Sequence, residues 1–297
     1  MSVGHFSRRH VLALLAVSAA HAALPGRARA HTASLLAELE ARHGGRLGVQ
    51  VLDGDSPLPG LDHRADERFA LCSTFKLLLA AVVLREAARG RLQLDEPLAF
   101  GAADLVAHSP VVGAQLERGR LTVVELAEAA QLTSDNAAAN LLLRRLGGPA
   151  AFTALLREMG DTETRLDRIE PAMNHVEAAD LRDTTTPAAM ARTVARLFSA
   201  DLLDEAAQQR LKGWMIATRT GLRRLRGGFP VDWQAGDKTG TAVIAGQPNR
   251  HNDVAVVWRP GRAPLVVAAF YEAPGHFPSM RAEDDAVLAE VGRLIGT

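Results

Sequence analysis

Strand-like and helix-like segments are unevenly distributed along this chain, and their order limits the folds that it can adopt. Residues 46–53 alternate like a half-buried strand, and a short second strand is expected near Leu61. After a long stretch of helical patterns, strands return at about 236–241, 253–258 and 265–271. Strands from both ends of the chain therefore build one antiparallel sheet, and an all-helical domain is inserted between them.

The predicted fold class is α+β, with helices at 32–42 and 280–295 flanking the sheet. We assign residues 31–65 and 221–297 to the sheet domain and residues 66–220 to the helical domain. A site that binds a small molecule is expected in the cleft between the two domains.

The length, composition and net charge of the chain limit the kinds of partner that it can have. The chain has 297 residues, 47% of them hydrophobic, which suffices for a large core. Its 34 basic and 34 acidic residues give a formal net charge of zero, so nothing indicates a nucleic-acid or membrane-surface partner. The single cysteine, Cys72, has no partner for an intramolecular disulfide. We expect a monomer that acts on a small molecule.

Residues 1–30 have the features of an export signal that is cleaved from the mature protein. A twin-arginine pattern spans 7–12, an apolar stretch spans 11–24, and Ala28-Arg29-Ala30 provides a small-x-small cleavage site. The alternative, an uncleaved anchor helix, is disfavoured because the apolar stretch is too short to span a bilayer comfortably. The sequence predicts a periplasmic or secreted protein, exported by the twin-arginine pathway and free of the membrane after cleavage.

Ser73 and Lys76 lie three residues apart at the start of a predicted helix, where their side chains are neighbours. A serine hydroxyl is a weak nucleophile unless a base takes its proton, and a desolvated lysine can be that base. The chain has only three lysines and otherwise uses arginine, which cannot be deprotonated in a protein. Lys76 and Lys238 are therefore candidates for chemistry, whereas Lys212 has no motif around it and is assigned to the surface.

The stretch 161–185 has neither a helical nor a strand period, although Thr186 and Pro187 then start another helix. An Ω-type loop of this length in a compact domain is usually functional or disordered, and its many opposite charges favour order. The loop carries Glu170 and Asn174. A carboxylate beside a side-chain amide can hold and deprotonate a water, although such a pair by itself is more often simply solvated.

Four motifs follow one another along the chain: Ser73-x-x-Lys76, Ser134-Asp135-Asn136, Glu170-x-x-x-Asn174 and Lys238-Thr239-Gly240-Thr241. Each motif alone is weak evidence for a function, but the presence of all four in this order along the chain is strong evidence. The chain resembles the class A serine β-lactamases over essentially its whole predicted mature length, and looks closest to the broad-spectrum members. The resemblance implies a β-lactamase/transpeptidase-like fold and the hydrolysis of penicillins and cephalosporins, which confers antibiotic resistance.

The resemblance also implies the catalytic roles. Ser73 attacks the lactam carbonyl, and a water activated by Glu170 hydrolyses the resulting acyl-enzyme. Either Lys76 or Glu170, acting through a water, removes the serine proton. Ser134 passes a proton to the departing nitrogen, and the backbone N–H groups of Ser73 and Thr241 form the oxyanion hole.

The residues implied to bind substrate are Asn136, Asn174, Lys238, Thr239, Thr241, Arg224 and His108. For the substrate carboxylate, Arg250 is the alternative to Arg224, and either arginine is otherwise a solvated surface charge. His108 either lines the substrate or is a plain surface histidine. Asp135 is expected to cap the turn between two helices.

Three further features concern the loop and the cysteine. Arg168 and Asp183 resemble the ion pair that pins the long loop and so positions its carboxylate. Some carbapenem-hydrolysing relatives bridge the cysteine before the nucleophile to a second cysteine, and here Ala242 occupies that second place. The bridge is therefore impossible, which puts carbapenem hydrolysis in doubt and makes Cys72 a buried, inert thiol.

Other kinds of protein share some of these motifs. A D-alanyl-D-alanine carboxypeptidase has the serine–lysine and Lys-Thr-Gly motifs, but Glu170 and Asn174 argue against it. A penicillin-sensor module requires a retained membrane segment, and a serine-dependent glutaminase fits neither the export signal nor the loop. Since the ten histidines have no metal-ligand spacing, we expect no metal and no cofactor.

Overall fold

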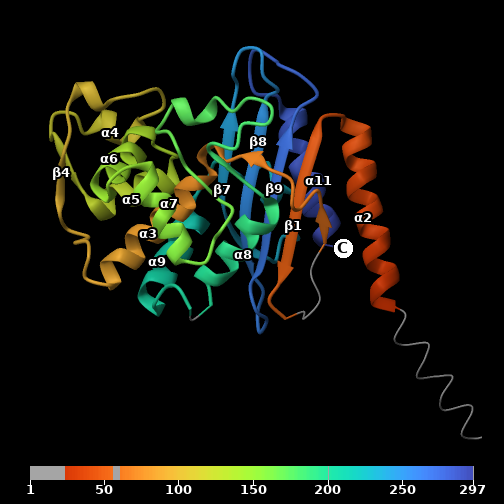
Figure 1. The fold of residues 1–297 in the computed structure, drawn as a ribbon. Helices are drawn as coiled ribbons and strands as arrows, with labels where there is room; N and C mark the ends of the chain where they lie inside the picture. The colour runs from red at the N-terminus through yellow and green to blue at the C-terminus, as the bar shows by residue number, and fades with distance from the viewer. Residues whose placement is uncertain (1–23, 56–60, 200, 297) are drawn as a thin grey trace, which may run out of the picture.

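The computed structural model describes residues 24–55, 61–199 and 201–296. A five-stranded antiparallel sheet runs through it in the order β2-β1-β9-β8-β7 (Figure 1). Its strands are β1 (Arg46–Asp53), β2 (Asp62–His63), β7 (Gln234–Ala242), β8 (Arg250–Trp258) and β9 (Leu265–Glu272). Because β1 pairs with β9 along its whole length, the predicted sheet from both ends of the chain is confirmed.

Helices surround the sheet unevenly. They are α2 (Leu24–His43), α3 (Phe75–Ala88), α4 (Pro110–Ala114), α5 (Val123–Leu132), α6 (Asn136–Leu146), α7 (Pro149–Glu158), α8 (Pro187–Leu197), α9 (Glu205–Ala217), α10 (Leu225–Gly228) and α11 (Ala282–Gly296). Figure 1 shows α2 and α11 beyond one face of the sheet, with α3, α5, α6 and α7 clustered on the side of β7. Within the described ranges, no helix is long and apolar enough to cross a membrane.

The central strands are buried on both faces. Along β9, Val266 and Phe270 join the core that the sheet shares with α3 and α5, whereas Val267 and Ala269 pack with Leu288 of α11. Successive side chains of a strand point to opposite faces, so each face contributes to a different core. This double burial explains why β8 and β9 have nearly continuous apolar sequences.

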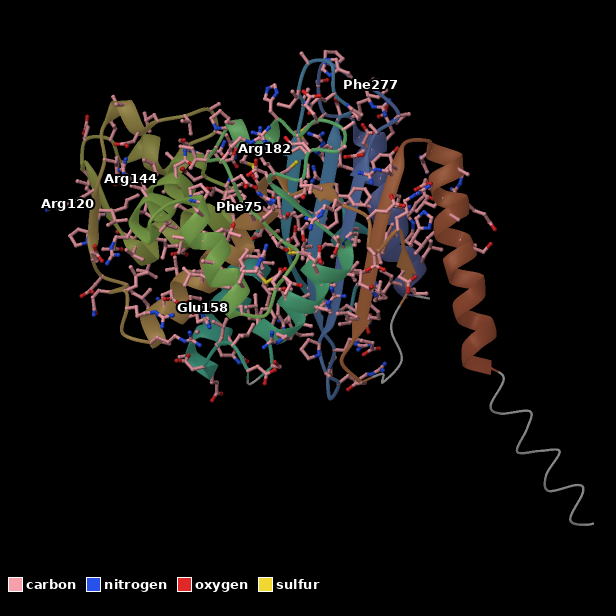
Figure 2. All side chains as sticks on the ribbon, viewed as in Figure 1. Phe75, Arg120, Arg144, Glu158, Arg182 and Phe277 are labelled. Carbon is pink, nitrogen blue, oxygen red and sulfur yellow. The ribbon has the colours of Figure 1, made fainter. Side chains whose placement is uncertain are left out.

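Helix α3 occupies the centre of the helical part. Every residue from Phe75 to Glu86 is buried, as expected for a helix that is apolar on all sides. Figure 2 shows Phe75 near the middle of the molecule, whereas Arg120 and Arg144 lie at the outer edge of the helical part. The start of α3 is therefore held in place by packing from all directions.

The structure adds elements that sequence patterns did not reveal. β3 (Phe69–Ala70) pairs with β6 (Thr184–Thr185), and β4 (Pro97–Ala99) pairs with β5 (Arg120–Thr122). Strands this short carry too little periodicity to be recognised. The first pairing joins the residues before Ser73 to the end of the long loop. Helix α2 begins at Leu24, earlier than predicted, and residues 1–23 of the proposed export signal lie outside the described residues.

Candidate active site

The predicted nucleophile, Ser73, lies in a 3-10 turn (Cys72–Thr74) that leads directly into α3. Lys76, the second residue of α3, is fully buried, and its Nζ lies 2.8 Å from Ser73 Oγ. The spacing predicted this contact, although the chain before Phe75 forms a 3-10 turn rather than an α-helix. The hydroxyl therefore has an amine within hydrogen-bonding distance.

The Lys76 amine sits among oxygen atoms from three parts of the chain. Its Nζ lies 2.9 Å from Glu170 Oε1 and 3.0 Å from the carbonyl oxygen of Ser134, and it also donates to Asn136 Oδ1. Burial lowers the pKa of Lys76, and the Glu170 carboxylate opposes that shift. A lowered pKa makes the neutral amine, which can accept a proton, easier to reach near neutral pH.

Ser134 lies between the two buried lysines. Its Oγ is 3.4 Å from Lys76 Nζ and 3.1 Å from Lys238 Nζ, and its backbone φ is 59°. Burial, and then repulsion from the Lys76 charge, lowers the pKa of Lys238 to about 7. A hydroxyl held between two such amines can pass a proton between neighbouring groups.

Glu170 faces Ser73 from the long loop. Ser73 Oγ lies 3.4 Å from Glu170 Oε1, and Asn174 Nδ2 donates to Glu170 Oε2 at 2.7 Å. Asn140, on α6, accepts from the Glu170 N–H at 3.0 Å and donates to its carbonyl oxygen at 2.9 Å. No role was assigned to Asn140 from the sequence, because an asparagine within a helix gives no sign of a distant backbone partner.

Buried carboxylates fix the loop that carries Glu170. Asp183 is fully buried; it accepts from the backbone N–H groups of Asp167 and Arg168 at 2.7 and 3.0 Å, and from Arg168 Nε at 2.5 Å. At the start of the loop, Asp161 accepts from Thr193 Oγ1 at 2.9 Å. The structure therefore brings Arg168 and Asp183 together. It also ties the start of the loop to α8, through Asp161 and Thr193.

Strand β7 forms the opposite wall, close to the nucleophile turn. A Cβ at Gly240 would lie 2.9 Å from the carbonyl oxygen of Leu71, so only glycine allows this approach. The strand also carries Thr239, whose Oγ1 donates to Thr220 Oγ1 at 2.8 Å, and Thr241. The lysine and both threonines of the fourth motif thus lie on a strand that touches the Ser73 turn.

The two candidate arginines have different surroundings. Arg224 is 2% exposed; it donates to Asp285 Oδ1 at 2.8 Å and to Thr241 Oγ1 at 2.7 Å. It is therefore a buried support beneath β7 and not a solvated surface charge. Arg250 is also buried, but it donates to backbone carbonyls of the long loop instead. Thr220 and Asp285 were not identified from the sequence, since no motif surrounds them.

The second motif is tied to the segment before α4. His108 is exposed, its Nε2 is 2.8 Å from the carbonyl oxygen of Thr133, and its own carbonyl oxygen accepts from the Asn136 N–H at 2.9 Å. Asn136 Nδ2 donates to the carbonyl oxygen of Ala107 at 2.7 Å. Asp135 caps α6 and also accepts from two N–H groups of α4, so it holds two helix starts together.

Cys72 lies behind the nucleophile in a small apolar cluster with Ala242 and Val176. Burial raises the pKa of its thiol to about 12, which leaves it protonated and unreactive at neutral pH. Across the described part of the chain, no group of three potential ligands is arranged to hold a metal ion.

Comparison with known proteins identifies the family. The model of the Beta-lactamase enzyme family matches residues 31–297. The chain is 43% identical over 258 residues to the carbapenem-hydrolyzing β-lactamase KPC of Klebsiella oxytoca, covering 87% of this chain and 85% of that one. A solved ancestral class A β-lactamase (GNCA) has a TM-score of 0.83 and 50% identity, covering 89% of this chain and 98% of that one. The chain belongs to the class A β-lactamases.

Other relatives extend this assignment. β-Lactamase AST-1 of Nocardia asteroides is 44% identical over 264 residues, covering 87% of this chain and 81% of the relative. A β-lactamase structure from Burkholderia vietnamiensis has a TM-score of 0.82 and 45% identity, covering 89% of this chain and 94% of that one. This class A enzyme is therefore a hydrolase that acts on the β-lactam amide, and the predicted fold class is confirmed.

Proposed function

We propose that this β-lactamase opens penicillins and cephalosporins through an acyl-enzyme on Ser73, which a water activated by Glu170 then hydrolyses. One observation carries the proposal: the Ser73 hydroxyl lies 2.8 Å from the Lys76 amine and 3.4 Å from the Glu170 carboxylate. A nucleophile, an amine and a carboxylate in mutual contact provide both steps of such a reaction.

In acylation, Ser73 Oγ forms a bond to the lactam carbonyl carbon, and the C–N bond of the ring then breaks. Two bases lie within reach of the serine proton: Lys76 directly, and Glu170 through a water. Ser134, 3.1 Å from Lys238 Nζ, delivers a proton to the ring nitrogen. The backbone N–H groups of Ser73 and Thr241 stabilise the oxyanion.

In deacylation, Glu170 takes a proton from a water that attacks the ester carbon. Ser73 Oγ and Glu170 Oε1 are in direct contact at 3.4 Å, so a water beside this pair can bond to both groups. Asn174 Oδ1 is buried and has no donor within the described part of the protein. A water bound to Glu170 can donate to this oxygen, which supports Asn174 as the second residue that holds it.

Substrate binding divides between the two walls of the site. The charge of Lys238 and the hydroxyls of Thr239 and Thr241 bind the substrate carboxylate, and Arg224 holds Thr241 from beneath. Asn136 contacts the substrate's side-chain amide, and His108 lines the entrance. Asp135, Arg168 and Asp183 position these groups without touching substrate.

The location and assembly of the protein follow from its sequence. The twin-arginine pattern and the cleavage site within residues 1–30 support export by that pathway to the periplasm or the exterior. The balanced charge supports a protein that works without nucleic acid or a membrane surface, and a monomer is taken as the default assembly. The division into a sheet domain (31–65 and 221–297) and a helical domain (66–220) agrees with the position of the site residues.

A chromogenic cephalosporin assay on the purified mature chain tests the proposal. Wild type is expected to turn over many equivalents, with no change in EDTA, whereas Ser73→Ala is expected to lose activity by at least about 10³-fold. The near-isosteric Cys72→Ser serves as a matched control and should retain turnover. Wild type that binds one equivalent and then stops would instead indicate a carboxypeptidase or a sensor.

A further inference from the structure

Arg250, the first residue of β8, connects the sheet to the loop that carries Glu170. Its side chain is 6% exposed, and its guanidinium donates to the carbonyl oxygens of Asn174 at 3.0 Å and Val176 at 2.6 Å. Gln247 Oε1 accepts from the same guanidinium at 2.9 Å, and Glu272 Oε1 lies 3.5 Å from its Nε. Both terminal nitrogens of the guanidinium are therefore held by hydrogen bonds.

Beyond Val176, the side chains of the loop are largely exposed. Between Val176 and Asp183, the side chains of Glu177, Ala178 and Ala179 are exposed, and Leu181 is 52% exposed. A cavity of about 450 Å³ separates this part of the loop from the turn between β7 and β8. Two other contacts reach this part of the loop: Val176 packs with Ala242, and Gln247 Nε2 donates to Glu177 Oε1 at 3.1 Å. Arg250 adds two contacts to the loop backbone, at Asn174 and Val176.

We propose that Arg250 is a positioning residue for deacylation, which sets the place of Asn174 by holding the loop backbone on both sides of His175. This inference rests on the proposed roles of Glu170 and Asn174. Asn174 Nδ2 donates to Glu170 Oε2 at 2.7 Å, so a shift of the Asn174 backbone moves the amide away from the carboxylate. A displacement of about 1 Å in a catalytic group can cost on the order of 10² in rate.

The same contacts exclude Arg250 as the group that binds the substrate carboxylate. Both terminal nitrogens already donate to the loop, and the side chain is buried behind it. Arg224 instead lies beneath β7 and donates to Thr241 Oγ1. The two arginines thus act on different steps: Arg224 on binding and Arg250 on hydrolysis of the acyl-enzyme.

The test compares Arg250→Met with Arg46→Met. Arg46 borders the same cavity and also pairs with Glu272, at 2.9 Å, but it donates to Glu67 and the Arg68 carbonyl oxygen, whereas Arg250 donates to the loop carbonyls at 174 and 176. For Arg250→Met, kcat and KM for a penicillin are both expected to fall by about tenfold, leaving kcat/KM within about twofold. Quenched samples should show a penicilloyl adduct by mass spectrometry. Arg46→Met should match wild type in both readouts.

Arg250→Lys provides a second variant that keeps the charge and loses one of the two carbonyl contacts, and it should show a smaller change of the same kind. Near-ultraviolet circular dichroism checks that each variant is folded. A raised KM with a lowered kcat/KM and no adduct would overturn the proposal and make Arg250 a substrate-binding residue. Equal falls in Arg250→Met and Arg46→Met would also overturn it. Wild type that itself stayed acylated would refute the proposed function instead.

Discussion

The nucleophile turn and the loop at 161–185 both contribute to one site, but they are held by different forces. Ser73 and Lys76 lie at the start of α3, which apolar side chains surround on every side. Glu170 lies on a loop that buries Leu166 and Met173 in the core, and that also depends on directional polar contacts from Asp183, Asn140 and the sheet arginine described above. Packing therefore dominates around the groups that form the acyl-enzyme, whereas the groups that hydrolyse it depend on directional hydrogen bonds in addition to packing.

This difference has a consequence for mutation. Cores are close-packed, so a change near α3 is felt as lost stability. A polar contact in the loop is directional, so its loss moves Glu170 or Asn174 while the acylation groups stay in place. The two chemical steps of the enzyme should therefore be separable by substitutions that lie outside the reacting atoms.

Among substitutions outside the reacting atoms, the largest effect is expected for Asp183→Asn, which removes the charge that binds Arg168. Breaking one partner of a buried ion pair costs on the order of 3 kcal/mol, so the melting temperature should fall. The rate of acylation should stay within about twofold, whereas deacylation should slow by at least about tenfold. Stopped-flow acylation and steady-state kcat measure the two rates. Arg182→Met, which removes the exposed partner of Asp180, is the control and should change neither rate.

If Asp183→Asn slowed acylation as much as deacylation, the loop and the nucleophile turn would move as one unit. The contrast between a packed half and a hydrogen-bonded half would then fail. Equal melting temperatures for Asp183→Asn and wild type would show that the buried pair does not hold the loop.

A smaller effect is expected for the pH dependence of kcat/KM, which reports on substrate binding and acylation. Burial lowers the pKa of Lys238 to about 7, so its charge is present below that pH and is lost as the pH rises through it. Since the charge attracts the substrate carboxylate, kcat/KM should decline above about pH 7, by at most about tenfold per pH unit. Lys238→Arg should abolish this decline, because arginine stays protonated. An alkaline limb that is the same in both proteins would assign the decline to another group.

The same lysine makes a matching prediction for stability. Between pH 7 and the usual lysine pKa of 10.5, the unfolded chain binds a proton at Lys238 that the folded chain does not. The free energy of unfolding therefore receives a contribution that increases with pH over this window. Below pH 7, both states are protonated and the cost of burying the charge is present in full.

Much of this architecture was accessible from the sequence, because it depends on local rules. The alternation at 46–53 predicted β1 with its observed bounds, and Thr186-Pro187 predicted the start of α8. The scarcity of lysine separated Lys76 and Lys238, both fully buried, from Lys212, which lies on α9 beside Trp258. In each case a short pattern has one dominant physical cause.

The remainder depends on distant partners that no local pattern reveals. Asn140 binds the backbone of Glu170, and Asp285 on α11 binds Arg224, across separations of 30 and 61 residues. Arg250 was an alternative for the substrate carboxylate, yet its partners are loop carbonyls. The sequence shows that an arginine is present; only the fold determines which acceptor it reaches.

The most direct test of a separately held deacylation step is the intact mass of Glu170→Gln after mixing with a penicillin. Glutamine keeps the shape of the side chain but cannot take a proton from water, so deacylation should slow by about 10²- to 10⁴-fold. We expect one penicilloyl group on Ser73 that persists for hours, while wild type returns to its free mass within the mixing time. A variant that never becomes acylated, or one that clears the adduct as fast as wild type, would contradict the account.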